Sequence, residues 1–152
     1  MHLIIYLKGN PSSGVFFPAD NTFELKGFSD VDWGACQATR RSLTGFYIFM
    51  GMIPISWKTK KQTTVARSFA KAKYRSMKAA VCEIVWLNNL LKDQGVEVPT
   101  PVPFFCDNKA AIHITENPVF HERAKHMEID CHVVRDKYKE GLILPTFMVS
   151  KQ

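Results

Sequence analysis

The sequence SFAKAKYRSMKAAVCEIVWLNNLLKD, residues 68–93, is the longest stretch of this chain with a helical pattern. Its apolar side chains recur every three or four residues, which predicts one amphipathic helix packed against a core. Gln94 and Gly95 follow it and form a suitable helix end. The residues expected to face inward form one stripe: Lys73, Met77, Ala80, Ile84, Leu87 and Leu91.

The first turn of this helix carries charges of the unfavourable sign. A helix N-terminus has a partial positive charge, so acids are favoured there and lysines at the other end. Lys71 and Lys73 stand in the opening turn, and Arg67 precedes it. Because Lys73 also begins the inward stripe, we expect a cation at the edge of the core. A local misfit of this kind typically marks a functional site, or a site that has lost its function.

Three strands are predicted before the helix. Phe23–Phe28 alternates apolar and polar residues, Gly45–Met50 is dense in aromatic and branched residues, and Ile55–Lys60 alternates again. Residues 51–54 read as a turn between the second and third runs. Together these runs predict a three-stranded antiparallel meander.

The chain after the helix adds two strands and two helices. Val102–Cys106 predicts a buried strand, Lys109–Thr115 a short helix, about His126 to Lys139 a second helix, and Leu142–Val149 a last strand. The whole order predicts an α+β fold with a five-stranded mixed sheet and flanking helices. Residues 1–22 contain turn clusters and are expected to be a lead-in.

Composition limits the class of protein. The chain has 152 residues and a net charge of +6, which suits one domain with a real core. The charge fits either a polyanionic partner or a well-solvated surface. The four cysteines form no CxxC pair, so we expect reduced thiols in an intracellular protein, cytoplasmic or nuclear and not secreted. No apolar run is long enough to span a membrane, and no membrane partner is expected. Trp33, Trp57 and Trp86 are expected in the core.

Acidic residues stand where strands end. Asp30 lies near the end of the first predicted strand, and Asp107 directly follows the fourth. Strand ends and an adjacent helix start can form one cleft, and carboxylates gathered there suit hard divalent cations. Two metals could then clamp the attacking and leaving oxygens of a phosphodiester. The alternative is that each Asp is a turn or cap residue, and Asp32 in particular is expected to be structural.

Basic residues gather around the third strand and the helix start: Lys58, Lys60, Lys61, Arg67, Lys71 and Lys73. Such a cluster could contact phosphates through charge alone. A solvated rim without a ligand explains it equally well.

Several motifs in the same order resemble the ribonuclease H domain of copia-type (pseudoviral) retrotransposon Pol polyproteins, in a plant-like version. The motifs that carry the resemblance are YLKGN at 6–10, FSDVDW at 28–33, TRRSLTG at 39–45, ISWKTKKQ at 55–62, CDNKAA at 106–111 and NPVFHER at 117–123. The resemblance implies that residues 1–22 are the end of the reverse-transcriptase connection segment and residues 23–152 the ribonuclease H-like domain. The chain then looks like a fragment of a polyprotein in which this domain was originally fused to a reverse transcriptase.

The resemblance also implies an activity and its residues. The family hydrolyses the RNA strand of an RNA–DNA hybrid with two magnesium ions held by four acids. By position, Asp30 matches the first acid and Asp107 the third. The second should be the last glutamate of a Ser-Ser-x-Glu-Ala-Glu-Tyr segment, where this chain has Lys73, with Lys71 at the other glutamate. The fourth acid belongs to a C-terminal helix that we expect to be missing, since the chain ends at Gln152.

These departures predict a catalytically impaired or dead domain. Lys73 should repel magnesium and pair with Asp30 and Asp107, so magnesium is not expected to bind. One alternative is a non-catalytic module that binds an RNA–DNA hybrid or another nucleic acid weakly, through charge; another is a relic or protein-interaction fragment. The residues expected to contact nucleic acid are Lys58, Lys60, Lys61, Arg67, Lys71 and Asn108.

Overall fold

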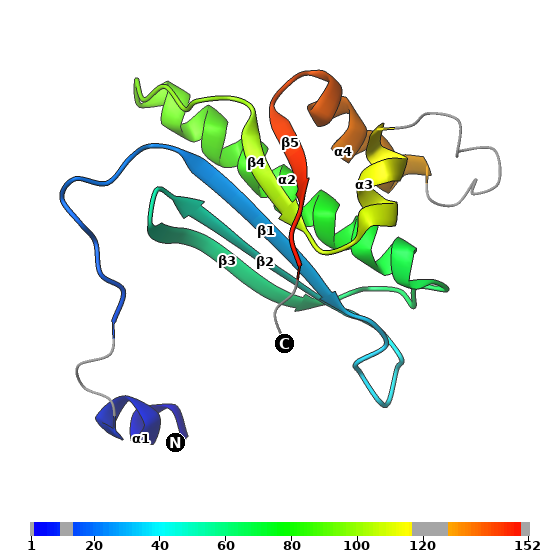
Figure 1. Cartoon of the computed structure of the whole chain (residues 1–152). Helices are drawn as coiled ribbons and strands as arrows, with labels where there is room; N and C mark the ends of the chain where they lie inside the picture. The colour runs from blue at the N-terminus through cyan, green and yellow to red at the C-terminus, as the bar shows by residue number, and fades with distance from the viewer. Residues whose placement is uncertain (1, 10–13, 117–127, 150–152) are drawn as a thin grey trace.

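The computed structural model describes residues 2–9, 14–116 and 128–149 (Figure 1). The helices are α1 (His2–Gly9), α2 (Phe69–Asp93), α3 (Lys109–Glu116) and α4 (Glu128–Lys139). The strands are β1 (Leu25–Asp32), β2 (Leu43–Met50), β3 (Ile53–Lys61), β4 (Val102–Cys106) and β5 (Ile143–Phe147). The motif at residues 117–123 lies outside the described residues. No helix in the described part of the chain is long and apolar enough to cross a membrane.

The five strands form one mixed sheet in the order β3-β2-β1-β4-β5. β1 pairs antiparallel with β2, and β2 with β3, which confirms the predicted meander. β4 runs parallel to β1, and β5 parallel to β4. Gly27 of β1 lies opposite Phe104 of β4. Asp30 and Asp107 each follow three residues later, so the parallel register brings the two acids to the same level.

Helix α2 crosses one face of this sheet, with α4 packed beside it (Figure 1). The interface explains one glycine in β1. A Cβ on Gly27 would lie 2.7 Å from Ile84 Cδ1 and 2.9 Å from Phe104 Cδ2. Only glycine therefore lets α2 approach β1 so closely. The largest fully buried side chains of this core are Tyr74, Lys73, Phe104, Leu25, Ile48, Met77 and Ile84.

The tryptophans are not in the core, so that prediction was wrong. Trp57 and Trp86 are 59% and 56% exposed, and Trp33 is also exposed. Trp57 pairs with Tyr47 on the face of the sheet turned away from α2, because side chains alternate along a strand. Trp86 stands on α2 outside the inward stripe. Aromatic residues in a sequence show neither which face of a strand nor which side of a helix is covered.

Two local predictions also need correction. Residues 2–9 form a helix, an element that was not predicted within the lead-in. Ile53 and Pro54 belong to β3 rather than to the preceding turn. Asn21 ties the lead-in to that turn: its Nδ2 donates to the Met50 carbonyl at 2.8 Å, and its Oδ1 accepts from the Met52 N–H at 2.9 Å. The division at residues 22 and 23 stays a prediction.

Candidate functional site

Three charged side chains meet where the carboxyl ends of β1 and β4 lie beside the start of α2. Asp30 comes from β1, Asp107 directly follows β4, and Lys73 lies in the second turn of α2. Lys73 Nζ donates to Asp30 Oδ1 at 2.8 Å and also contacts Asp107 Oδ1. We call these three residues the ion-paired centre. The structure therefore brings together the two acids and the lysine that the sequence singled out.

Burial within the ion-paired centre is uneven. The Lys73 side chain is 0% exposed, that of Asp107 is 32% exposed and that of Asp30 is 79% exposed. The ammonium thus lies beneath two carboxylates, which face solvent on their other side. An unpaired ammonium would be costly at this depth. Its two carboxylate partners account for a lysine among the largest fully buried side chains.

The ionisation of the pair follows from these contacts. Burial acts to lower the pKa of Lys73, but its hydrogen bonds to Asp107 and Asp30 outweigh burial and raise the pKa above the usual 10.5. Burial acts to raise the pKa of Asp30. The hydrogen bond from Lys73, that from the Val31 N–H and the Lys73 charge together lower it below the usual 3.8. Lys73 is therefore an ammonium and Asp30 a carboxylate at neutral pH.

Ser76 anchors α2 beside this centre. Its Oγ donates to the Asp30 carbonyl at 2.5 Å and to the Gly45 carbonyl at 3.2 Å, so one side chain joins α2 to β1 and β2. Sequence reasoning missed this residue. The signal was present, because Ser76 follows Lys73 by three positions and so shares its helix face.

Gln62 fixes the first turn of α2 from the other side. This buried residue follows β3, and its Nε2 donates to the Ala72 carbonyl at 2.9 Å and to Thr44 Oγ1 at 3.0 Å. Sequence reasoning missed this residue too, and no local pattern reveals it, because its partners lie on β2 and α2. Gln62 and Ser76 together hold the backbone of α2 that carries Lys73.

The start of α2 is capped in the ordinary way. Ser68 is the N-cap residue, and its Oγ accepts from the Lys71 N–H at 3.3 Å. Phe69 is the first helical residue, so it does not displace the cap. The first turn contains no acid. The unfavourable charges of this turn are therefore not offset by any acid of the helix itself.

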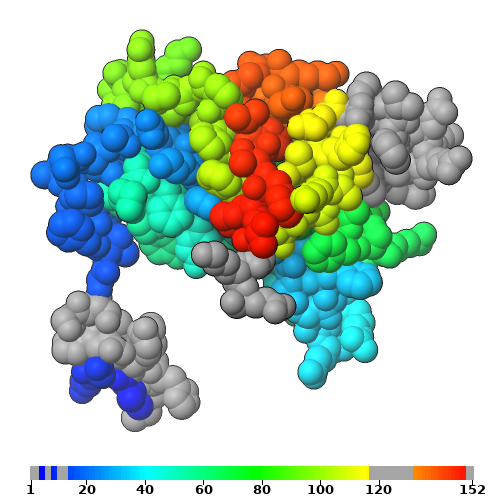
Figure 2. Space-filling view, in the orientation of Figure 1, coloured from blue at the N-terminus to red at the C-terminus, as the bar shows by residue number. Residues whose placement is uncertain are grey.

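The basic residues predicted to form one cluster divide between different places. Lys73 is buried in the ion-paired centre, and neither Arg67 nor Lys71 lines the pocket between β3 and α2 that is described below. Asn108 acts on the helix that follows it, because its Oδ1 accepts from the Ala111 N–H at 2.9 Å. Lys61 Nζ lies 3.4 Å from Cys36 Sγ, on the loop at residues 33–42 that projects from the sheet (Figure 2). Hydrogen bonds with Thr39, with a smaller effect of Lys61, lower the pKa of Cys36 to about 7.

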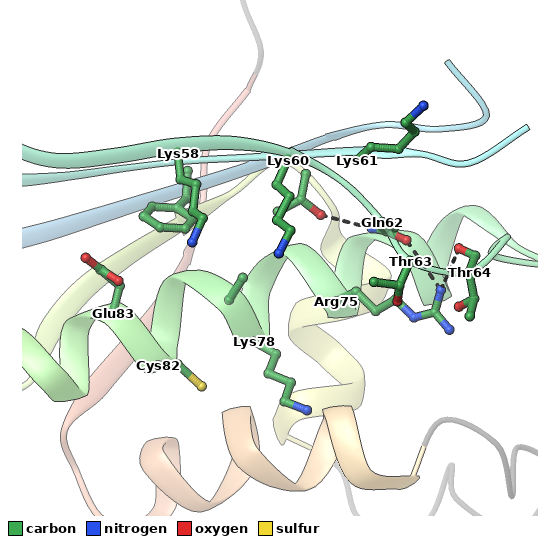
Figure 3. A pocket seen from close by; sticks show the side chains of 13 residues that line it. Lys58, Lys60, Lys61, Gln62, Thr63, Thr64, Arg75, Lys78, Cys82 and Glu83 are labelled. Atoms are coloured by element: carbon green, nitrogen blue, oxygen red, sulfur yellow. Dashed lines mark hydrogen bonds between the residues drawn. The ribbon is translucent and has the colours of Figure 1, made fainter. Parts of the chain in front are cut away.

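A pocket of about 800 Å³ lies between β3 and α2, and we call it the basic groove (Figure 3). Lys58 and Lys60 point from β3 toward α2, whereas Lys61 points away. Arg75 Nη1, on the α2 side, donates to the Thr64 carbonyl at 3.1 Å. The lining residues are Thr44, Phe46, Lys58, Lys60, Lys61, Gln62, Thr63, Thr64, Arg75, Lys78, Ala79, Cys82, Glu83.

The side chains of the ion-paired centre do not match the ligand set of a magnesium site. Magnesium takes oxygen ligands, and an ammonium offers only N–H donors. Between Asp30 and Asp107 stands Lys73, which uses one oxygen of each. Within residues 2–9, 14–116 and 128–149, no group of three or more His, Cys, Asp or Glu side chains could hold a metal ion.

Two plant transposon polyproteins contain a segment similar to this chain. The chain is 38% identical over 141 residues to the retrovirus-related Pol polyprotein from transposon RE1 of Arabidopsis thaliana, which covers 93% of this chain and 10% of that protein. It is 30% identical over 134 residues to the polyprotein from transposon TNT 1-94 of Nicotiana tabacum, covering 88% of this chain and 10% of that protein. The chain thus spans about one tenth of the length of these curated relatives. No protein-family model matches the chain.

Solved structures of similar shape are ribonuclease H domains. The RNase H1 called LC11, isolated from compost, superposes with a TM-score of 0.59 at 12% identity, covering 84% of this chain and 86% of that one. The N-terminal RNase H domain of rv2228c from Mycobacterium tuberculosis gives a TM-score of 0.53 at 11% identity, covering 82% and 83%. The fold is therefore that of the ribonuclease H class, as predicted. Within that class, the chain is homologous to a segment of the Pol polyproteins of copia-type plant transposons, which confirms the resemblance.

Proposed function

We propose that this ribonuclease H-like domain descends from a magnesium-dependent hydrolase of RNA in RNA–DNA hybrids and has lost that activity. The observation that carries the proposal is the buried Lys73 ammonium between Asp30 and Asp107. In this proposal the centre holds no magnesium ion: Lys73 neutralises one of the two aspartate charges, which leaves a formal net charge of −1. Lys71 stands at the other glutamate position of the related segment, two residues before Lys73.

The reason is electrostatic. Replacing a carboxylate by an ammonium changes the local charge by two units. At a separation of ~4 Å and an effective dielectric constant near 20, each unit-charge interaction is worth about 4 kcal/mol. Lys73 repels a divalent cation and already takes one carboxylate oxygen of each acid. Magnesium therefore meets repulsion and fewer available oxygen ligands than three carboxylates would offer.

Magnesium titration by calorimetry tests this proposal on three chains. The unaltered protein should show no stoichiometric heat. Lys73→Glu should gain magnesium binding, because it places a third carboxylate at the centre. Lys71→Glu is the matched control, since it makes the same charge change two residues away and should gain none. Tight stoichiometric binding by the unaltered protein would overturn the proposal.

Cleavage of a labelled RNA–DNA hybrid in magnesium or manganese tests the activity itself. The unaltered protein should leave the RNA strand intact. Cleavage that disappears in Asp107→Asn would show that the centre still catalyses hydrolysis, and would refute the loss of activity. The Asp107→Asn control matters because it separates hydrolysis at this centre from a contaminating nuclease.

A second candidate function is nucleic-acid binding without hydrolysis, on an RNA–DNA hybrid or another nucleic acid. It is supported by the exposed lysines of the basic groove and by the net charge of +6. Binding through phosphates should weaken steeply as salt rises. Binding that does not depend on salt, or no binding at all, would favour a relic or protein-interaction fragment instead.

We also propose a polyprotein context for the domain. Similarity to Pol polyproteins over most of this chain supports a former fusion to a reverse transcriptase, with residues 1–22 as the end of its connection segment. Expression of residues 23–152 beside the full chain tests the boundary. Equal cooperative unfolding of both would support it. A large loss of stability in the shorter chain would count against it, and Asn21 is the contact most at risk.

A further inference from the structure

We infer that the basic groove binds a single strand of nucleic acid, with phosphates on Lys58 and Lys60 and a base stacked on Trp86. The inference rests on the proposed nucleic-acid binding and names its site. That site lies apart from the ion-paired centre, since no residue of the centre lines the groove. It therefore holds whether or not the centre hydrolyses RNA.

The charge of the groove points to a phosphate ligand. Lys58 and Lys60 are alternate residues of β3, so their side chains leave the same face of the strand about 7 Å apart. Among the described residues, no carboxylate lies within ion-pair distance of either lysine. Apart from Lys61, which points away, the charged lining side chains are Lys58, Lys60, Arg75 and Lys78, against Glu83 alone. Glu83 already accepts a hydrogen bond from Ser56 Oγ at 2.7 Å.

Trp86 adds a stacking surface at the end of the groove. Arg75, Ala79 and Cys82 line the groove at helical spacing, and Trp86 continues their side of α2, four residues beyond Cys82. Four residues correspond to about 6 Å along a helix axis. The indole is 56% exposed, although large aromatic side chains are normally covered. A cationic groove beside an exposed aromatic side chain is the combination that binds single-stranded nucleic acid.

A single strand fits this surface better than a duplex. Bases of a duplex are already paired and stacked, so none is free to cover Trp86. β2 contributes Thr44 and Phe46 to the groove; both are buried, and Thr44 Oγ1 already accepts a hydrogen bond from Gln62 Nε2. Recognition should therefore use backbone charge and one stacking contact, with little dependence on sequence or sugar.

Fluorescence anisotropy with a labelled oligothymidylate tests the phosphate contacts. The pair Lys58→Gln and Lys60→Gln should weaken binding and lower the slope of log K against log salt by about 1.4, because each lost contact contributes about 0.7. The matched control is Lys92→Gln with Lys139→Gln. It removes the same charge from the ends of α2 and α4 and should keep the slope. Equal slopes for the two double variants would overturn the inference.

The stacking contact is tested with a pair of tryptophans. Trp86→Ala should weaken binding of the oligothymidylate about tenfold. Trp57→Ala is the matched control, because Trp57 is 59% exposed but lies on the opposite face of the sheet, and it should bind as the unaltered protein does. An RNA–DNA hybrid that binds more tightly than the single strand, and is indifferent to Trp86→Ala, would refute the site.

These outcomes separate the inference from the function on which it rests. Salt-dependent binding that neither the lysine pair nor Trp86→Ala weakens would leave nucleic-acid binding standing and remove the groove as its site. Absence of salt-dependent binding to both the single strand and the hybrid would end both. Thermal unfolding of each variant shows whether a loss of binding reflects a loss of fold.

Discussion

The two ends of α2 follow opposite rules. Its last turn contains Lys92, where the helix dipole favours a cation, and the helix stops at Gln94 before Gly95, which adopts φ 76°. Its first turn contains Lys71 and no acid. Apart from Asp93 in its last position, the C-terminal end therefore obeys local sequence rules. At the N-terminal end, Asp30 and Asp107 supply from two strands the negative charge that the helix lacks.

Lys73→Met tests this difference most strongly. Methionine keeps most of the length and removes the charge, which leaves two neighbouring carboxylates without their shared cation. Breaking one side of a buried pair costs about 3–5 kcal/mol, and we expect about 2–3 kcal/mol here because Asp30 is largely exposed. Urea unfolding measures the loss.

Lys71→Met is the control for that loss, since it removes the same charge two residues earlier in α2 without touching either aspartate. We expect a change within about 0.5 kcal/mol. If both variants lost similar stability, pairing with Asp30 and Asp107 would not be what stabilises Lys73 near the N-terminus of α2. The contrast drawn between the two helix ends would then be wrong.

The N-cap offers a second, smaller test. Ser68→Ala removes the oxygen that accepts from the Lys71 N–H, and should cost about 1 kcal/mol in urea unfolding. Ser68→Asp should be at least as stable as the unaltered chain, because it keeps an acceptor and adds the acid that this end lacks. Loss of stability in Ser68→Asp would mean that Asp30 and Asp107 already offset the positive charge at the helix N-terminus, so that a further acid there is unfavourable.

The pH dependence of stability tests the pair itself. Because the pKa of Asp30 is lowered in the folded protein, Asp30 contributes stability above pH 3.8, and this contribution is lost as the pH falls through the pKa of the folded state. Because the pKa of Lys73 is raised in the folded protein, Lys73 contributes stability below pH 10.5, and this contribution is lost as the pH rises through the pKa of the folded state. The difference in free energy of unfolding between the unaltered protein and Lys73→Met should thus be constant between about pH 4 and pH 10 and shrink outside that window. The acid loss should stay under about 1 kcal/mol, because Asp30 is exposed.

The sequence predicts most of this fold because periodicity is local. The meander, the span of α2 and the strand Val102–Cys106 all follow from residues read in order. The inward stripe of α2 also placed Lys73 at the core. The residues that hold the site in place were out of reach, because Gln62 and Ser76 act across elements. The pairing of β1 with β4 decides which strand ends meet.

The basic residues show the same limit on the surface. Lys58, Lys60 and Lys61 are neighbours in sequence, yet strand alternation sends the first two into the basic groove and the third toward Cys36. Trp86 belongs with the groove only because α2 lies along β3. A charge cluster in a sequence therefore predicts attraction to a polyanion, and the fold decides which of its members can share one ligand.

The smallest expected effect is the most direct test of the two ends. Lys71→Glu and Lys92→Glu each lower the net charge from +6 to +4, so general charge effects are matched. The first places an acid at the N-terminus and should stabilise the fold by about 0.3–1 kcal/mol, whereas the second places one at the C-terminus and should destabilise it by a similar amount. Thermal unfolding at low salt measures the opposite shifts, and 1 M salt should shrink both. Shifts of the same sign would show that net charge, rather than the direction of the helix, governs both ends. Asp30 and Asp107 already place negative charge near the N-terminus of α2. If Lys71→Glu stabilises the fold by less than Lys92→Glu destabilises it, the difference measures how much of the N-terminal positive charge the two aspartates already offset.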